Sequence, residues 1–304
     1  MSAVDSPGAA QARARFFHSG DAFNLKLPPV PAGVFPYDAV RARQSRASGF
    51  VLCDQSGAFA APFAATTPLM LARYAFIAAS EMLAAEFAAS GSIWYVIAGA
   101  GRATIAGDEP AFDWSAGDVF LAPGGARIAL EAGAQGAVLW VVTNEPQLAF
   151  EGLRPAEPAD RGIDAVHYPA AEIARQLARV IALPRDDTTA GCALIFSSER
   201  AESSRNIMPS LTLSLNTVPA GEHQRAHRHN SAAVTLILRG SRCYSLVGDR
   251  RCDWSPFATL VTPATEPHSH HNAGAERAAF LIVQDGGLHY HTRTMGFTFL
   301  EPDV

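Results

Sequence analysis

The sequence predicts an all-β protein made of two barrels joined by a short helix. Two observations lead to this fold class: β-type runs bounded by turn residues fill most of the chain, and the spacing of several residues repeats after about 140 positions. A stretch with helical periodicity lies between the repeated units. With 304 residues, 48% of them hydrophobic, the chain is long enough for two such units.

The first segment, residues 1–50, is expected to be an extended arm. Alanine and arginine dominate its start, and four prolines follow within a short space, at Pro28, Pro29, Pro31 and Pro36. Clustered prolines favour extended backbone without internal hydrogen bonds. We expect the arm to lie across the fold or across a neighbouring subunit.

Residues 51–150 are expected to form the first barrel. Apolar, aromatic and β-branched runs recur there between Gly, Pro or Asp, namely IWYVIAG, GRATIAG, WSAGDVFLAPGG and GAVLWVVT. The dipeptide Gly107-Asp108 predicts a hairpin turn, as does Gly248-Asp249 later in the chain. The uncharged stretch 56–72 contains two prolines, so we interpret it as strand and loop and not as a membrane span.

An internal repeat predicts a second barrel over residues 206–304. The repeated pairs are Trp114 and Trp254, Asp113 and Asp253, Pro123 and Pro263 at an offset of 140, and Gly99 and Gly240, Gly107 and Gly248 at 141. The slip of one residue falls in a hairpin loop, where insertions are tolerated. Two β units of the same build indicate a two-barrel protein.

Residues 151–205 are expected to link the barrels. Within them, Pro169–Leu183 has apolar residues at helical spacing, with a proline in the first turn, and predicts a short amphipathic helix. The apolar side of this helix is expected to pack on the barrels. The polar stretch Thr188–Arg205 is expected to be a loop.

Eight of the ten histidines lie between His223 and His291, and three of them form the pattern of a metal site. In a strand, His227 and His229 would lie on one face while the residue between them points away. His268, from a separate strand, would complete a three-imidazole set. Such a set leaves coordination positions free for water, oxygen or a substrate, which is typical of a reactive divalent transition metal.

The first barrel is expected to lack this site. At the same offset, the position corresponding to His268 is Ile128, and those corresponding to His227 and His229 are about Glu86 and Ala88. We therefore assign the first barrel a structural or pocket-shaping role.

The spacing resembles the two motifs of the cupin superfamily. The matching positions are Gly221-x5-His227-x-His229, Gly240, and Pro263-x4-His268-x3-Asn272. Two positions depart from the motifs: Ala233 stands where a Glu is usual, and Phe257 where a Gly is expected. The runs HRHNSAAVTLILRG and TPATEPHSHHNAG look most like ring-cleaving dioxygenases of the gentisate type, which also replace the Glu. The resemblance implies a bicupin, with two jelly-roll (double-stranded β-helix) barrels.

The same resemblance implies a reaction. It suggests Fe(II) at His227, His229 and His268, with Zn, Ni or Mn as alternative ions, and cleavage of an aromatic ring that bears hydroxyl and carboxylate groups. The expected partners are a small aromatic acid and O2. Two other functions stay open: a non-catalytic bicupin that binds a small acid or sugar through the metal, and a metal-dependent isomerase or hydrolase.

His270 is the candidate catalytic residue beside the three ligands. It shares strand parity with His268, so it is expected to hydrogen-bond a ligand or the substrate, whereas His271 should point away. His289 and His291 are expected on one face of a late strand, lining the pocket or an interface.

Four arginines near the motifs are candidates to bind a carboxylate, because a guanidinium can donate two parallel hydrogen bonds to it. They are Arg225, Arg228, Arg239 and Arg242. Cys243 and Cys252 flank a turn and are expected to be core thiols, not a disulfide. Trp114 and Trp254 are expected to pack inside the barrels.

Composition limits the partners. The net charge is −5 and the basic residues form no cluster, so neither nucleic acid nor an anionic membrane surface is an expected partner. The four cysteines have no CxxC spacing and the N-terminus has no apolar signal core, which favours the cytoplasm. The arm and the exposed barrel edges favour a homo-oligomer, either a dimer or a tetramer.

Overall fold

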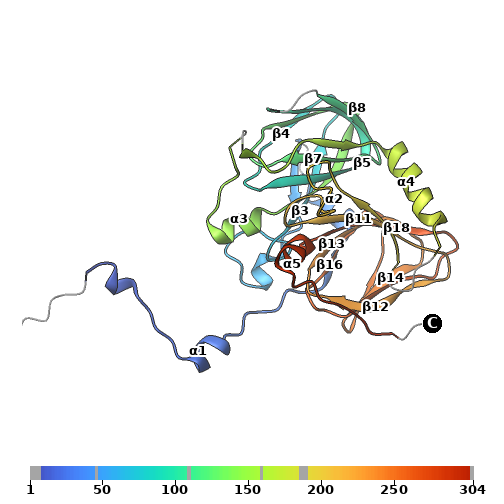
Figure 1. Cartoon of the computed structure of the whole chain (residues 1–304). Coiled ribbons are helices and arrows are strands. Elements are labelled where there is room, and N and C mark those ends of the chain that lie inside the picture. Colours follow the sequence, from blue (N-terminus) through green and yellow to red (C-terminus); the bar gives the residue numbers. More distant parts are fainter. Residues whose placement is uncertain (1–7, 45–46, 108–110, 158–159, 185–190, 302–304) are drawn as a thin grey trace, which may run out of the picture.

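Two β-barrels pack against each other, with short helices at their edges (Figure 1). The computed structural model describes residues 8–44, 47–107, 111–157, 160–184 and 191–301. Strands dominate this part of the chain, and a helix lies between the two barrels in sequence. The prediction of an all-β fold with two barrels and a connecting helix is therefore confirmed.

The first barrel consists of an eight-stranded sheet in which β2-β3-β8-β5-β7-β9 are hydrogen-bonded in that order, while β4 pairs with β8 and β6 with β5. Its strands are β2 (Gly49–Leu52), β3 (Leu71–Ile77), β4 (Met82–Ala85), β5 (Gly91–Ile105), β6 (Phe112–Ser115), β7 (Val119–Pro123), β8 (Ile128–Thr143) and β9 (Val166–Tyr168). All the pairings in this sheet are antiparallel.

The runs IWYVIAG and GRATIAG form one long strand, β5, rather than two. Its pairing with β8 is irregular between Val96 and Ala98 and again between Gly99 and Gly101. Gly99 has a φ of +89°, and a Cβ there would lie 2.2 Å from the carbonyl oxygen of Gly136. Glycine at this bulge lets one strand bend and take part in both ends of the barrel.

The second barrel consists of two sheets, with strand orders β1-β16-β13-β18-β11-β10 and β15-β14-β17-β12-β19. Their strands are β1 (Gly33–Phe35), β10 (Cys192–Phe196), β11 (Thr212–Val218), β12 (His223–His229), β13 (Ala233–Arg239), β14 (Cys243–Val247), β15 (Arg250–Asp253), β16 (Thr259–Thr262), β17 (His268–Asn272), β18 (Ala278–Gln284) and β19 (Phe297–Phe299). The hairpin expected at Gly248-Asp249 joins β14 to β15. At the other expected turn, Asp108 lies outside the described residues.

Three strands come from segments expected to be arm or linker. β1 pairs with β16, β10 with β11, and β9 with β7. The loop expected over Thr188–Arg205 is thus wrong at Cys192–Phe196, where the short apolar run CALIF covers an edge of the second barrel. Residues 188–190 of that stretch lie outside the described part of the chain.

The helices are short, and their bounds are α1 (Ser19–Phe23), α2 (Tyr37–Ala42), α3 (Glu145–Glu151), α4 (Ala170–Ala182) and α5 (Gly286–Thr292), with 3-10 turns η1 (Gln11–Arg13) and η2 (Ser56–Ala58). The connector helix α4 begins directly after Pro169 and buries Ile173 and Leu177, as the periodicity predicts. None of the described helices is both long enough and apolar enough to span a membrane.

The late strand expected at His289 and His291 is wrong, because both residues lie in α5. Their alternation imitates a strand, but Gly286 and Gly287 start a helix directly after β18. A Cβ at Gly287 would lie 2.6 Å from the carbonyl oxygen of Pro209, so the absence of a side chain lets α5 pack closely on the loop before β11.

The largest apolar cluster joins the two barrels. It includes Tyr74 and Trp140 of the first barrel and Leu213 and Leu281 of the second. The Trp140 indole N–H donates to Thr259 Oγ1 (2.9 Å), and the Tyr74 hydroxyl also contacts this oxygen (2.7 Å). Polar groups at the centre of the cluster therefore fix how the barrels meet.

Phe257, the residue that replaces the motif glycine, lies at the same junction. Its φ of +59° is in the left-handed region, as is that of Gly117 (+93°), its counterpart in the first barrel. The Phe257 ring packs edge-on against Tyr37, and its carbonyl accepts a hydrogen bond from Tyr74. The turn thus keeps the backbone shape of a glycine while its side chain packs at the barrel junction.

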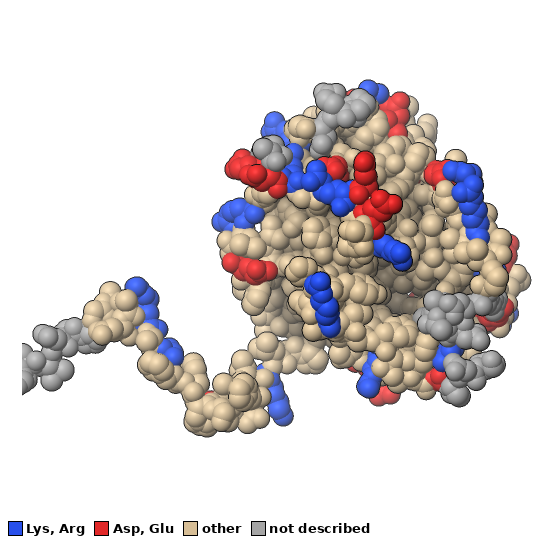
Figure 2. All heavy atoms as spheres, in the orientation of Figure 1, with Lys and Arg blue, Asp and Glu red and all other residues tan. Residues whose placement is uncertain are grey.

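The arm before β1 extends away from both barrels (Figure 1). Its large apolar side chains are exposed: Phe16, Phe17, Phe23, Leu25 and Leu27. On the face in Figure 2, acidic and basic side chains are interspersed over the barrels. This distribution agrees with the absence of a basic cluster in the sequence.

Candidate metal centre

The three histidines of the motifs meet inside the second barrel. His227 and His229 lie on β12, and His268 lies on the adjacent strand β17, where its Cα pairs with that of His227. All three side chains are buried, and one nitrogen of each ring lies within 4.8 Å of the corresponding nitrogens of the others. The alternation of β12 and the pairing with β17 thus bring the predicted set together.

Backbone carbonyls orient the three rings. Nδ1 of His227 donates to the Arg225 carbonyl (2.7 Å), and Nδ1 of His268 donates to the Glu266 carbonyl (2.9 Å). Nδ1 of His229 donates to the Ser231 carbonyl (2.8 Å). A carbonyl can only accept, so each Nδ1 carries the proton and each Nε2 has a free lone pair. Three such nitrogens are a suitable donor set for a divalent transition metal, and the residues present therefore fit the ion.

Burial keeps these imidazoles neutral. Desolvation lowers the pKa of His227, and it lowers the pKa of His229 to about 4 and that of His268 to about 2. Neighbouring imidazoles are a second cause of the last two of these pKa shifts. A metal ion binds the neutral ring, so no proton has to be removed at neutral pH.

The three rings line a cavity of about 430 Å³. Its other polar side chains are the imidazole of His270 and the hydroxyls and carboxamides of Ser214, Asn216, Gln224, Ser231, Thr235, Thr262, Gln284 and Tyr290. Apolar contacts come from Ile282, Met295 and Phe297, and Phe297 stacks on His227 at 5.1 Å between ring centroids. Among the described residues that line it, none is Asp, Glu, Lys or Arg.

Gln224 was missed by the sequence analysis. Simple alternation from His227 places it on the outer face, but the pairing of β12 with β17 shifts register between Gln224 and His227. Gln224 therefore pairs with His270 and lines the cavity. Its buried Oε1 has no hydrogen-bond partner in the described part of the chain and can accept from a ligand.

Gln284, also missed, contacts the site from β18. Its Nε2 lies 3.3 Å from Nε2 of His229, the atom that would ligate an ion. Because His229 donates from Nδ1, the amide is the donor here. An ion bound at His229 would require this amide to give up the contact.

His270 lies where strand parity predicts. It is buried, lines the cavity, and hydrogen-bonds Ser245 Oγ through Nδ1 (2.7 Å). Desolvation lowers its pKa to about 3. His271 points to the outer face, as expected, and stacks between His223 and Tyr244.

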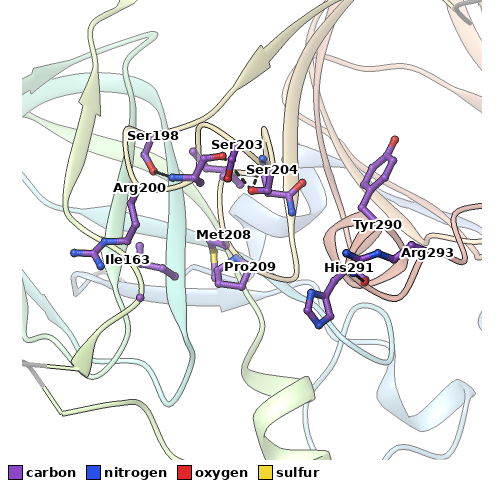
Figure 3. A pocket seen from close by; sticks show the side chains of 14 residues that line it. Ile163, Ser198, Arg200, Ser203, Ser204, Met208, Pro209, Tyr290, His291 and Arg293 are labelled. Atoms are coloured by element: carbon purple, nitrogen blue, oxygen red, sulfur yellow. Dashed lines mark hydrogen bonds between the residues drawn. The ribbon is translucent and has the colours of Figure 1, made fainter.

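His289 and His291 do not join the metal centre. His289 Nδ1 contacts Asn230 Nδ2 at 3.0 Å, and His291 lines a separate pocket of about 530 Å³. Figure 3 shows this pocket. Tyr290 and His291 of α5 and its C-cap Arg293 lie on one side, and Ser198, Arg200, Ser203 and Ser204 lie on the other. Within the described residues, the set of His227, His229 and His268 is the one group of three or more His, Cys, Asp or Glu side chains placed to share an ion.

The four candidate arginines also lie outside the cavity. Arg228, Arg239 and Arg242 are exposed. The Arg225 guanidinium lies 3.8 Å from the ring centroid of Phe299 and donates to the Glu301 carbonyl at 3.0 Å. The bulge that turns Gln224 inward turns Arg225 outward, which parity alone did not predict.

The first barrel has no such histidine set. Its Cα register pairs Ala85 with Ile128, as the second barrel pairs His227 with His268. The structural counterparts of His227 and His229 are therefore Ala85 and Phe87, both buried, and the expected alignment with Glu86 and Ala88 is wrong by one residue. A further one-residue slip between Phe87 and Gly99 escaped the repeat.

Apolar and aromatic side chains fill the space in the first barrel that the cavity occupies in the second. They include Phe87, Trp94, Phe120 and Ile128, and the Trp94 and Phe120 rings stack at 5.3 Å. All four cysteines are free thiols, and Cys243 and Cys252 are buried, as expected. Trp114 is buried, while Trp254 is partly buried and packs against a core cluster of the second barrel.

Comparison with known proteins agrees with this architecture. Residues 214–284, which contain the three histidines, match the family described as Cupin domain. A gentisate 1,2-dioxygenase from Ralstonia sp is 32% identical over 79 residues, a match that covers 26% of this chain. The match spans 22% of the length of that relative.

Solved structures share the fold over most of the chain. A salicylate 1,2-dioxygenase from Pseudoaminobacter salicylatoxidans, crystallised with gentisate, superimposes with a TM-score of 0.75 at 12% identity, covering 93% of this chain and 89% of that one. An oxalate decarboxylase superimposes with a TM-score of 0.58 at 14% identity, covering 88% and 79%. The two jelly-roll barrels expected from the motif resemblance are confirmed.

Proposed function

The chain is a bicupin of the cupin superfamily that resembles gentisate-type dioxygenases, and from this premise we propose that it is a metal-dependent dioxygenase. The proposed metal ligands are His227, His229 and His268, and the proposed ion is Fe(II). The proposed substrate is a small aromatic acid that carries a hydroxyl group, with O2 as the second substrate. The proposed reaction is cleavage of the aromatic ring.

One observation carries this proposal. Three buried, neutral imidazoles place one nitrogen each within 4.8 Å of the others inside a cavity of about 430 Å³, and their Nε2 lone pairs are free because Nδ1 donates to a carbonyl. Three protein ligands leave positions for other molecules, whereas a structural site normally closes with four. Fe(II) bound there would supply Lewis acidity and redox chemistry toward dioxygen.

The protein's own groups would orient the substrate. His270 is the proposed catalytic residue and would hydrogen-bond a substrate oxygen, while the unpaired Oε1 of Gln224 would accept from a hydroxyl. With no Arg or Lys among the described lining residues, a carboxylate would meet positive charge at the ion held by the three neutral histidines. Phe297 and Met295 would limit the access of water.

The test combines metal analysis with oxygen uptake. Protein purified without oxygen and loaded with Fe(II) should consume oxygen with at least one of gentisate, salicylate or a catechol-type carboxylate. Ring-opened product should form in proportion to the oxygen consumed. Tight binding of these acids without any oxygen consumption, across the whole panel, would sink the dioxygenase proposal.

The neutral lining favours one alternative function. Hydroxyls and carboxamides around a metal site suit a small hydroxylated ligand as well as an aromatic acid. A bicupin that binds a small acid or sugar through the ion without redox chemistry would show calorimetric binding and no oxygen uptake. An isomerase or hydrolase would convert its substrate without oxygen.

Two further proposals concern the cellular location and the oligomeric state of the protein. Free thiols at all four cysteines are compatible with the reducing cytoplasm proposed as its location. The exposed apolar arm supports the proposed homo-oligomer, a dimer or a tetramer.

A further inference from the structure

A chain of hydrogen bonds reaches His270 from behind the cavity wall. The indole N–H of Trp254 donates to Ser245 Oγ at 2.8 Å, and Ser245 Oγ lies 2.7 Å from His270 Nδ1. Ser245 lies on β14 directly opposite His270 on β17, so the two side chains share the inner face. Ser245 is fully buried and His270 is 3% exposed, so water does not compete for these bonds.

The direction of the chain follows from counting protons. An indole nitrogen can only donate, so the Ser245 oxygen accepts from Trp254. The Ser245 hydroxyl then has one proton to donate, and His270 Nδ1 is the acceptor at hydrogen-bond distance. If Nδ1 carried the proton instead, the buried serine proton would be left unpaired, which is costly. His270 is therefore protonated at Nε2.

This tautomer is the opposite of that in the three proposed ligands. His227, His229 and His268 donate from Nδ1 to carbonyls and keep a lone pair on Nε2. His270 accepts at Nδ1 and has an N–H at Nε2. A protonated ring nitrogen cannot ligate an ion but can donate to a substrate oxygen.

The first barrel has other residues at the positions that correspond to Ser245 and His270. The register of β5 and β8 places Ala103 opposite Leu130, where the second barrel has Ser245 opposite His270. The tryptophan is present in both barrels, but the indole nitrogen of Trp114 is buried without a hydrogen-bond partner among the described residues. The serine and the histidine therefore occur together, in the barrel that contains the three-histidine site.

We propose that Ser245 and Trp254 are positioning residues that hold His270 in its Nε2-protonated form, so that the ring presents a hydrogen-bond donor to the ligand in the cavity. This inference deepens the proposed function, because it rests on His270 facing the substrate. Packing alone, as the repeat suggested for Trp254, does not explain the hydrogen bond to Ser245.

The tautomer can be measured independently of catalysis. Zn(II)-loaded, 15N-labelled protein is diamagnetic, and long-range 1H–15N spectra separate protonated from unprotonated ring nitrogens. His270→Gln identifies the signals by their loss. In the unchanged protein, Nε2 of His270 should be the protonated nitrogen. In Ser245→Ala the preference should be lost or reversed, and Ser245→Thr, which keeps the hydroxyl, should restore it.

Two further variants make the test specific. Trp254→Phe keeps an aromatic ring and removes the indole donor, so the tautomer preference should weaken without reversing. Ser269→Ala is the matched control, because Ser269 hydrogen-bonds His271 on the outer face of the same strand (2.8 Å) and takes no part in the hydrogen-bond chain of Trp254, Ser245 and His270, here called the relay. It should leave the His270 signals unchanged.

Oxygen uptake then separates the two proposals. With Fe(II) and an active substrate, Ser245→Ala should lower kcat by roughly tenfold to a hundredfold with metal content retained, as expected when a supporting hydrogen bond is lost, and Ser245→Thr should recover most of it. A His270 ring protonated at Nδ1 in the unchanged protein would overturn the relay. The measured Nε2 tautomer without any oxygen uptake would leave the relay standing and remove the dioxygenase.

Discussion

The four imidazoles that line the cavity do not all carry their proton on the same ring nitrogen. The difference follows from the group that Nδ1 of each ring contacts. Backbone carbonyls accept from the Nδ1 atoms of His227, His229 and His268. In contrast, the hydroxyl of Ser245 donates to Nδ1 of His270. Burial depresses the pKa of all four rings and keeps them neutral. Identical side chains thus divide into metal ligands and a hydrogen-bond donor.

At the residue scale we expect His227→Ala or His268→Ala to remove the bound metal while the fold is retained. Losing one of three ligands leaves two, and the apolar cores that stabilise the barrels do not contain these side chains. Metal content by elemental analysis, together with circular dichroism, measures both effects. Unchanged occupancy in either variant would rule out the site.

The matched control for this prediction is His271→Ala. His271 lies on the same strand as His268 but on the outer face, stacked on Tyr244 at 4.6 Å. It should keep the full metal content of the unchanged protein, which we expect to be one ion per chain. A second ion per chain, held in the first barrel, would contradict the assignment of Ile128 and Phe87 as core residues.

At the scale of single elements, α5 contributes both to the cavity and to the pocket beside it. Tyr290 lines both spaces, and the helix follows β18 directly after Asp285. The Asp285 carboxylate accepts from the backbone N–H of Ala232 at 2.8 Å and is buried. Desolvation is the main cause that raises its pKa to about 7.

This raised pKa predicts a pH dependence. The folded state holds the Asp285 proton up to about pH 7, while the unfolded chain releases it near 3.8, so the free energy of unfolding falls as pH rises between these values. Asp285→Asn keeps an acceptor for Ala232 and cannot ionise. The stability of this variant relative to the unchanged protein should therefore increase from pH 5 to pH 8, as measured by urea unfolding.

A difference between the two proteins that stays flat over this range would show that Asp285 does not titrate in the folded state. Measuring both proteins at each pH cancels the contributions of the histidines, which act in the opposite direction. Their lowered pKa values make the unfolded state the better proton acceptor below about 6.5, so stability is lost as the pH falls toward about 2–4.

At the scale of the whole molecule, the two barrels share one core. Thr259 lies in its centre, where its hydroxyl contacts Trp140 and Tyr74. We expect Thr259→Val to lower the free energy of unfolding by about 1–3 kcal/mol, because the buried Trp140 N–H loses its acceptor. Thr259→Ser keeps the hydroxyl and should cost less. A larger loss in Thr259→Ser than in Thr259→Val would show that the methyl group, and not the hydroxyl, stabilises the junction.

The exposed arm predicts self-association. Five large apolar side chains between Phe16 and Leu27 are exposed in the described part of the chain, which favours burial against a second copy. Light scattering should give the mass of a dimer or a tetramer for the full chain and a lower mass for the double variant Phe16→Asp, Phe17→Asp. A monomeric mass for the unchanged protein would refute the expected homo-oligomer.

The sequence alone was sufficient for the features that depend on short-range order. Alternation in β12 predicted the shared face of His227 and His229, helical spacing predicted α4, and the repeat predicted two barrels. Parity with His268 also placed His270 inside and His271 outside. These patterns are local because side-chain direction follows directly from the strand or helix period.

Only the tertiary structure decided the features that depend on register between distant strands. The bulge in β12 brings Gln224 into the cavity and turns Arg225 away from it. A slip between β4 and Gly99 makes Phe87 the counterpart of His229. The pairing of β1 with β16 and the start of α5 at Gly286 likewise depend on contacts with remote segments. A one-residue change of register exchanges the two faces of a strand, and hydrogen bonding between strands, which a single sequence does not specify, fixes that register.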